Sequence, residues 1–134
     1  MDWALEVVVV PVSDVDRAKR FYAEQVGFTV DHDTPIGKDL RVVQLTPPGS
    51  ACSIVIGAGL AEMPPGAVKG LQLVVDDVEA ARAVLAAGGV DVTPVRHNEG
   101  GTWVDGPGGE WNSFIFFSDP DGNAWTVQQR PPRG

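Results

Sequence analysis

The chain has 134 residues, a length that fits one domain with a substantial buried core, and we place that domain at residues 1–134. Ten Lys and Arg against eighteen Asp and Glu leave a formal net charge of −8, which opposes nucleic acid and anionic membranes as partners. Cys52 is the only cysteine, so an internal disulfide and a cysteine-based zinc site are excluded.

The N-terminal residues carry neither of the two segments that direct a chain to a membrane. No basic segment is present, and Glu6 interrupts an apolar run that is too short to span a bilayer. We therefore expect a cytoplasmic protein with no membrane partner.

The first half of the chain predicts a strand, a helix and three further strands. An aliphatic run at residues 7–10 predicts the first strand. Ser13, with Asp16 three positions later, has the pattern of a helix N-cap. Apolar residues follow at helical spacing as far as Gly27, which we expect to end the helix in a left-handed cap. Strands are predicted at 28–32, 41–45 and 52–56, with turn sequences at 34–37 and 47–50 between them.

The second half repeats this order after a linker at residues 57–66. A strand is predicted at 71–75, and Asp76 with Glu79 has the N-cap pattern of a second helix. Gly88 and Gly89 are expected to end that helix. Strands follow at 91–96, 113–117 and 124–128.

An internal repeat relates the two halves. The segment 12–18 resembles the segment 75–81 at one constant offset, with Asp14, Val15 and Ala18 aligned to Asp77, Val78 and Ala81. The pattern predicts an α+β fold of duplicated βαβββ modules, module one at about 1–60 and module two at about 67–130.

Two phrases strengthen this interpretation. Residues 11–22, followed by Gly27 and Phe28, and the turn at residues 119–123 have the form found at the beginning and end of one fold family. In the turn, Pro120 presets the first corner and Gly122 supplies a left-handed residue. With its repeat, the chain resembles the vicinal-oxygen-chelate superfamily of glyoxalases, bleomycin-resistance proteins and extradiol dioxygenases. The resemblance implies a curved mixed sheet around a ligand cleft, helices on the outer face, and a homodimer.

Many members of that family chelate a divalent metal, and the resemblance places the ligands on the first and last strands of the modules. The matching positions here are Val7, Gly70 and Thr126, with the fourth near Ser53. None of these side chains has an imidazole or a carboxylate, which zinc, iron, manganese or nickel requires. We expect no metal and no cofactor.

A glycine-rich segment at residues 96–112 interrupts the second module and holds Trp103 and Trp111. Long loops in compact domains are commonly functional, so the two indoles could line the cleft. The alternative is a long hairpin whose tryptophans cap the core or a dimer interface.

Strand alternation selects the remaining candidates for ligand contact. The resemblance implies that one face of each strand lines the cleft. Strand alternation places Gln72, Thr126 and Gln128 on that face, and Gln44 is placed similarly. Acid–base chemistry would depend on His97, Asp105, Glu110 or Glu6, although His32 and His97 both have the setting of polar surface turns. The predicted ligand-binding residues are Val7, Gln44, Gln72, His97, Trp103, Asp105, Trp111, Thr126 and Gln128.

The leading hypothesis is a metal-independent protein that binds an aromatic or amphipathic small molecule in the cleft of the sheet. The alternative is a glyoxalase-like lyase or isomerase, or a cofactor-free biosynthetic enzyme that works by acid–base chemistry, for which the sequence assigns no catalytic residue. A purely structural role is the third reading.

Overall fold

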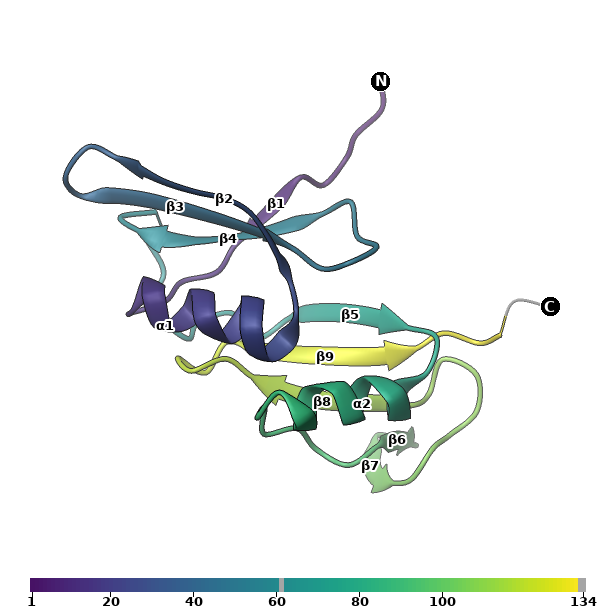
Figure 1. Ribbon diagram of the computed structural model, residues 1–134. Helices are drawn as coiled ribbons and strands as arrows, with labels where there is room; N and C mark the ends of the chain where they lie inside the picture. The colour runs from purple at the N-terminus through teal and green to yellow at the C-terminus, as the bar shows by residue number, and fades with distance from the viewer. Residues whose placement is uncertain (61, 133–134) are drawn as a thin grey trace. The chain divides into compact units, whose positions relative to one another are not determined.

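The computed structural model describes residues 1–60 and 62–132. The helix α1 continues into a π-helical segment, η1, before the chain enters β2. In chain order the elements are β1 (Val7–Val9), α1 (Val15–Arg20), η1 (Phe21–Val26), β2 (Thr29–Ile36), β3 (Leu40–Thr46), β4 (Ser53–Ala58), β5 (Leu71–Val75), α2 (Val78–Ala87), β6 (Arg96–Glu99), β7 (Thr102–Asp105), β8 (Phe114–Ser118) and β9 (Ala124–Gln129) (Figure 1).

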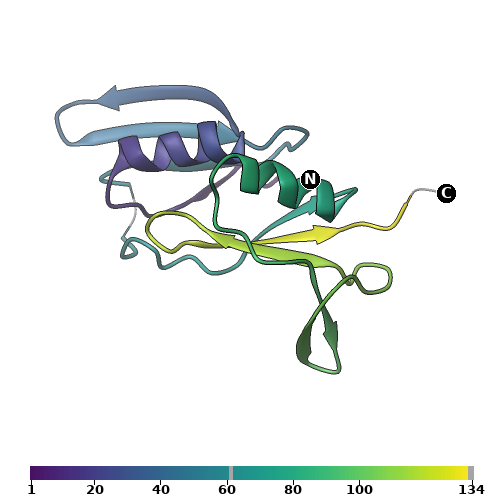
Figure 2. The ribbon, with the colours of Figure 1, turned by 60° about the horizontal axis from the view of Figure 1, so that its bottom comes forward.

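The strands form two mixed sheets, ordered β1-β4-β3-β2 and β5-β9-β8-β6-β7. In each sheet the first strand of the half pairs in parallel with its last strand, and the other pairings are antiparallel. This arrangement confirms the predicted α+β class and the duplicated plan. The second sheet has one strand more than the first, because β6 and β7 fold as a hairpin that projects from it (Figure 2).

The chain forms two compact units. The first consists of Met1–Val68 together with Asp119–Asn123, and the second of the rest of the described chain. The turn between β8 and β9 is therefore part of the first unit, although both strands that it joins belong to the second. The predicted linker at 57–66 begins inside β4, and its residue 61 lies outside the described residues.

The core of the first unit lies between one face of its sheet and the helical segment α1–η1. Val43 and Leu45 of β3 and Ile56 of β4 are completely buried, and Ile54 of β4 is almost so. Tyr22 stacks on Phe28 with ring centroids 5.7 Å apart. Burial of a side chain of this size contributes roughly 1.5–3 kcal/mol of transfer free energy, so this alternating pattern determines which face of the sheet receives the helix.

The second unit has the same layout. Ile115 and Phe117 of β8 and Val127 of β9 face α2, whose Val78 and Leu85 are buried. The next side chain in the same layer, Trp125, stacks on Phe117 at 5.9 Å with nearly parallel rings. The side chains between these positions on β8 and β9 consequently point to the opposite face of the sheet.

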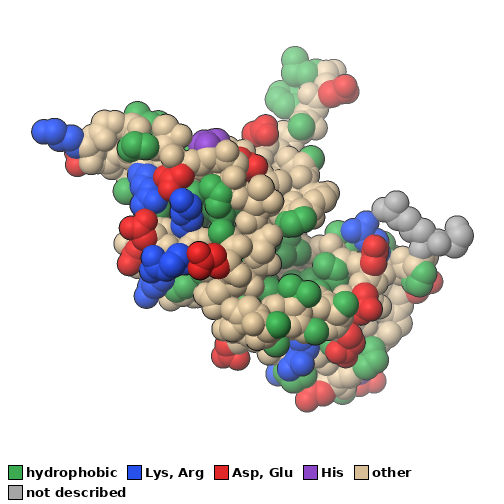
Figure 3. Space-filling model, in the orientation of Figure 1, with side chains coloured by type: hydrophobic (Ala, Val, Ile, Leu, Met, Phe, Trp, Pro, Cys, Tyr) green, Lys and Arg blue, Asp and Glu red, His purple; other side chains and the backbone are tan. Residues whose placement is uncertain are grey.

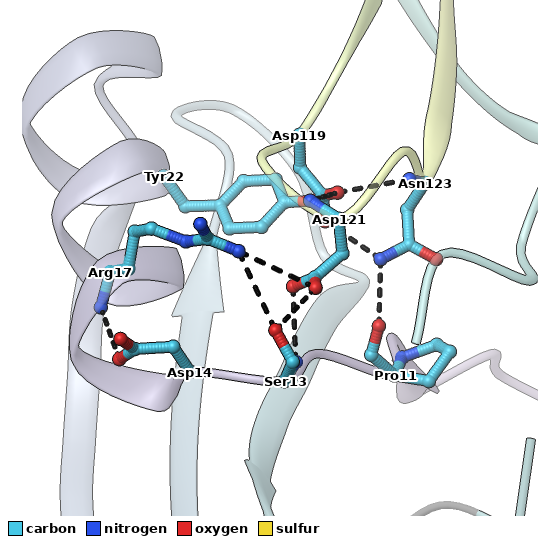
Figure 4. Close-up of polar contacts among 8 residues, drawn as sticks. All are labelled: Pro11, Ser13, Asp14, Arg17, Tyr22, Asp119, Asp121 and Asn123. Carbon is cyan, nitrogen blue, oxygen red and sulfur yellow. Dashed lines mark hydrogen bonds and ion pairs between the residues drawn. The ribbon is translucent and has the colours of Figure 1, made fainter. Parts of the chain in front are cut away.

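The turn at residues 119–123 is joined to the beginning of the chain by a buried polar network (Figure 4). The Tyr22 hydroxyl donates to Asp119 Oδ2 at 2.7 Å, and Asn123 Nδ2 donates to the same oxygen at 2.8 Å. Asn123 Nδ2 also donates to the carbonyl of Pro11. As predicted, Gly122 has a positive φ, of 94°, and its amide donates to the carbonyl of Asp119. The network aligns the turn with the strand–helix junction more than ninety positions earlier in the chain.

The predicted N-caps, Ser13 and Asp76, are wrong by one residue. Asp14 and Asp77 are the caps, and their carboxylates accept from the amides three positions later at 3.0 and 3.1 Å. The reason is tertiary: the Ser13 hydroxyl donates to Asp121 at 2.5 Å, and Asp76 pairs with Arg130 at 3.0 Å. The left-handed caps at Gly27 and Gly89 are confirmed, whereas Gly88 is right-handed.

Two strand predictions also need correction. Residues 34–36 were expected in a turn but extend β2 as far as Ile36, because each of them pairs with β3. The strand expected at 91–96 begins only at Arg96. Across the described part of the chain, no helix is long and apolar enough to cross a membrane.

Candidate functional site

The face of the second sheet opposite α2, here called the open face of the second sheet, carries two transverse rows of side chains. One row is Gln72, Thr126 and Phe116, which are direct partners across β5, β9 and β8. The next row is Val74, Gln128 and Phe114. The predicted orientation of Gln72, Thr126 and Gln128 away from the core is confirmed, since their neighbours Trp125 and Val127 are buried.

Aromatic rings cover the β8 side of this face. Trp103 of β7 meets Phe114 and Phe116 edge-on, with ring centroids 5.2 and 5.1 Å apart. The two phenylalanines are nearly parallel at 6.3 Å. Because Trp103 is 47% exposed, the cluster leaves aromatic surface accessible beside the glutamines. Edge-to-face contacts of this kind contribute about 0.5–1.5 kcal/mol each beyond buried area.

Two glutamines form a directional relay next to these rings. Gln72 Nε2 donates to Gln128 Oε1 at 2.7 Å, and Gln128 Nε2 donates to the carbonyl of Trp111 at 2.7 Å. Trp111 is 52% exposed and has a φ of +61°, which makes it the only non-glycine residue with a positive φ in the described chain. Left-handed backbone in a non-glycine residue is unfavourable and collects at binding and functional sites. The hydrogen bond from Gln128 holds the Trp111 segment against the sheet.

Asn112 fastens the same segment to the hairpin. Its side chain accepts from the amide of Asn98 at 2.8 Å and donates to the carbonyl of Asn98 at 2.9 Å. Gly108 is required here, because a Cβ at this position would stand 2.4 Å from the carbonyl oxygen of Asn112. The region 96–112, expected as a long loop or hairpin, is thus a short hairpin followed by a segment that the Asn112 hydrogen bonds hold against that hairpin.

His97 and Asp105 occupy the β6–β7 hairpin but differ in direction. Asp105 lies on the face of Trp103, two residues away on β7, and pairs with Arg96 at 3.2 Å. His97 lies on the opposite face of the hairpin, where its Nδ1 is 2.7 Å from the carbonyl oxygen of Gly106. Of the other acid–base candidates, Glu6 and Glu110 are exposed.

Val7 and Gln44 lie in the first unit. Val7 pairs with Ser53 across β1 and β4, as the predicted metal positions require, but neither side chain can bind a transition metal. Gln44 of β3 hydrogen-bonds His32 and Ser53. Among residues 1–60 and 62–132, no group of three or more His, Cys, Asp or Glu could hold a metal ion. The residues at these positions therefore do not fit the metal of the superfamily.

The sequence prediction omitted two residues of the open face, Phe114 and Phe116. The signal was available: in the run 113–117 these two alternate with Ile115 and Phe117, and a period of two places them opposite the core.

A charged cluster lies elsewhere, over α1 and the β2–β3 hairpin, where basic and acidic side chains gather (Figure 3). Arg41 bonds Asp33 through two nitrogens at 3.0 and 2.8 Å, and Lys19 bonds Asp33 at 2.8 Å. The hydrogen bonds from Arg41 and then Lys19 hold the pKa of Asp33 far below its usual range. This cluster belongs to the outer, helix-bearing side of the first sheet.

Comparison with known proteins gives a consistent result. Residues 4–127 match the model of the Glyoxalase/Bleomycin resistance protein/Dioxygenase superfamily. The chain is similar to a crystal structure described as TnmS3, an antibiotic binding protein from Streptomyces sp. CB03234, with 38% identity, a TM-score of 0.77, and coverage of 96% of this chain and 97% of that one. It is also 39% identical to a glyoxalase/bleomycin resistance protein from the same organism, with a TM-score of 0.74 and coverage of 94% and 100%. The uncharacterized protein YetH of Bacillus subtilis (strain 168) is 27% identical over 129 residues, or 91% of this chain and 94% of that protein.

Proposed function

Because the chain belongs to the Glyoxalase/Bleomycin resistance protein/Dioxygenase superfamily, we propose that it binds an aromatic or amphipathic small molecule, without a metal, on the open face of the second sheet. One observation carries this proposal: Trp103, Phe114 and Phe116 form an accessible aromatic cluster directly beside the Gln72–Gln128 relay. Small-molecule sites typically combine apolar and aromatic walls with a few positioned polar groups.

The chemistry of the face favours a flat ligand with a polar edge. Aromatic rings offer their faces and edges to another ring, and the amides can exchange hydrogen bonds with a carbonyl or hydroxyl. The net charge of −8 favours a neutral or cationic ligand over an anionic one. The description of TnmS3 as an antibiotic binding protein supports a role of this class.

Metal independence is part of the proposal. It rests on Val7, Gly70 and Thr126, whose side chains supply neither imidazole nor carboxylate at the positions where family members hold the metal. Binding is then expected to depend on apolar contact and hydrogen bonding alone.

We also propose a homodimer. β1 and β5 each lie at one edge of their sheets, and strands at a sheet edge present unpaired backbone groups that a second copy can cover. Sedimentation equilibrium is expected to give twice the chain mass of 14.2 kDa, and a single-chain mass would contradict the dimer without affecting the ligand proposal.

The experiment that tests ligand binding uses proflavine, a fluorescent planar aromatic cation, titrated in the presence of EDTA. Saturable binding is expected, and the substitution W103L is expected to weaken it about fivefold, because an aromatic contact contributes roughly 1 kcal/mol. The matched control is W3L, since Trp3 is 88% exposed near the N-terminus and far from β7 in sequence.

Binding should persist at high salt, where attraction between exposed charges is screened. Equal affinities for wild type, W103L and W3L, or binding that disappears with salt or EDTA, would overturn the proposal.

A further inference from the structure

The β6–β7 hairpin carries Trp103, but only a short stretch of backbone pairing attaches it to the rest of the second sheet. Its two strands pair with each other at four positions, whereas within the described chain β6 pairs with β8 at one position, Arg96 with Phe114. In Figure 2 the hairpin projects from the other strands. An isolated two-stranded hairpin is only marginally stable in water, so side-chain contacts must fix its position.

Three side chains make these contacts. Trp103 packs on two phenylalanines of β8, and Asn112 forms two hydrogen bonds with the backbone of Asn98. Because Asn98 pairs with Trp103 across the hairpin, Asn112 holds the strand opposite the indole. The third side chain is His97, on the hairpin face that points away from Trp103.

The His97 ring closes the base of the hairpin. Its Nδ1 lies 2.7 Å from the carbonyl oxygen of Gly106, which can only accept, so Nδ1 carries the proton and donates. Gly106 directly follows β7, and its amide donates to the carbonyl of Val95 at 2.7 Å. The residue after β7 is therefore bonded to both neighbours of Arg96, once through the backbone and once through the imidazole.

The bond from Nδ1 is the one that orients this ring. Nε2 lies 3.6 Å from an oxygen of Glu99, which is too long for a hydrogen bond, and the Glu99 side chain is 64% exposed. The His97 side chain is only 16% exposed. Water therefore has little access to replace the bond to Gly106 if the imidazole is removed.

The chain that follows the hairpin passes directly over His97. A Cβ at Gly108 would stand 2.7 Å from the Cβ of His97, a separation that side chains do not tolerate. The same segment then reaches Asn112, which bonds the other strand of the hairpin. His97 and Asn112 thus hold residues 106–112 and the hairpin together at two separate points.

We infer that His97 is a positioning residue for the proposed ligand site. From the side of the hairpin opposite the ligand, its bond to Gly106 fixes β7 so that Trp103 packs against Phe114 and Phe116. The imidazole itself touches no ligand. The effect on ligand affinity rests on the proposed function, whereas the ring tautomer and the packing of Trp103 are measured without any ligand.

The first test is the tautomer of His97 in the full chain, measured by long-range ¹H–¹⁵N correlation at about pH 8, where imidazole is mostly neutral. Nδ1 is expected as the protonated nitrogen and Nε2 as the bare one. A ring protonated at Nε2, or a mixture of the two tautomers, would overturn the inference.

A pair of amide variants separates positioning from loss of the ring. Asparagine places its amide nitrogen at the δ position, where Nδ1 stands, and glutamine places it at the ε position. H97N is therefore expected to keep the indole N–H resonance of Trp103 close to its wild-type position, and H97Q is expected to shift it. The indole resonance of the buried Trp125 shows that each variant folds.

A Trp103 resonance that H97Q leaves in place, or that H97N shifts as far as H97Q does, would contradict the positioning role. The wild-type tautomer and H97N decide the matter if H97Q does not fold.

The ligand test is a double-mutant cycle with proflavine. H97Q is expected to weaken binding by no more than the roughly fivefold loss expected for W103L, because it acts through that indole, and H97N is expected to restore most of the affinity. Combined with W103L, H97Q is expected to cause no further loss. Losses that multiply in the double variant would show that His97 acts independently of Trp103. If wild type does not bind proflavine at all, the proposed function fails, and the Trp103 resonance still decides the role of His97.

Discussion

The hydroxyl of Tyr22 donates a buried hydrogen bond of 2.7 Å to Asp119, 97 positions later in the chain. Asp119 also accepts from the amides of Asp121 and Asn123, so its carboxylate organises the whole turn. Tyr22 is completely buried and Asp119 is 5% exposed. The single contact therefore connects the first helical segment to the last turn inside one compact unit.

The substitution Y22F tests the strength of this connection. The ring and its packing against Phe21 and Phe28 are retained, and only the donor is lost. Hydrogen bonds to charged groups contribute roughly 1.5–3 kcal/mol, and we expect a loss of that size in the free energy of unfolding measured with urea. S13A is the comparison variant. The hydrogen bond from the Ser13 hydroxyl to Asp121 is exposed, and losing it is expected to lower the free energy of unfolding by about 0.5–1 kcal/mol. A Y22F effect no larger than that of S13A would contradict this account.

Asp33 predicts a specific dependence of stability on pH. Its pKa is lower in the folded than in the unfolded chain, because Arg41 and Lys19 donate to its carboxylate. Such a group stabilises the fold above the unfolded pKa, and that contribution is lost as the pH falls towards the folded value. The Asp33 side chain is 23% exposed, so solvent screening limits the effect to roughly 1 kcal/mol.

The measurement is urea unfolding of wild type and D33N at neutral pH and at about pH 3, below the ordinary aspartate pKa. D33N is expected to be less stable than wild type at neutral pH, and the difference is expected to shrink in acid. D105N is the control, because Asp105 is 77% exposed and its ion pair should contribute little at either pH. A difference in the free energy of unfolding between D33N and wild type that increases in acid would contradict this account of Asp33.

Local patterns predicted most of the fold, because the features concerned depend on neighbouring residues only. The period of two in β5 and β9 correctly separated Gln72 and Gln128 from the core, and the turn at Gly122 followed from its residue types. The failures have tertiary causes. Ser13 was a plausible N-cap until its hydroxyl was required by Asp121, and residues 34–36 had the composition of a turn but pair with β3.

The candidate site was less predictable than the fold for the same reason. Trp103 could be proposed from its glycine-rich surroundings, but its packing on Phe114 and Phe116 depends on the hairpin pairing of β6 with β7 and β8. The relay from Gln72 through Gln128 to the carbonyl of Trp111 joins three segments distant in sequence. The periodicity of residues within a single segment cannot predict a contact of this kind.

The absence of metal ligands at the family positions predicts indifference to divalent cations. Protein purified without chelator is expected to contain almost no metal by elemental analysis. Zinc, manganese and nickel are expected to leave its melting temperature unchanged, since a bound ligand would raise it by mass action. About one metal per chain with clear stabilisation would contradict the metal-free assignment of Val7, Gly70 and Thr126 and favour the glyoxalase-like enzyme.

Trp111 offers a way to separate ligand binding from stability. It is half exposed with a φ of +61°, a backbone conformation that glycine adopts without strain. In W111G the relief of strain, about 1–3 kcal/mol, opposes the entropy that glycine adds to the unfolded chain, about 0.5–1 kcal/mol. The hydrogen bond from Gln128 is retained, because its acceptor is the backbone carbonyl. We therefore expect W111G to be at least about as stable as wild type, although a large aromatic side chain is deleted.

The buried Trp125, 3% exposed, is the contrast, and W125A is expected to cost about 3–5 kcal/mol. Urea unfolding measures both variants, and proflavine titration then measures W111G alone. If the indole contacts the ligand, proflavine affinity falls in W111G while stability is kept. Unchanged affinity would mean that Trp111 is not part of the ligand site and that its segment has a structural role only. A large loss of stability would mean that the indole packs into the unit in spite of its exposure.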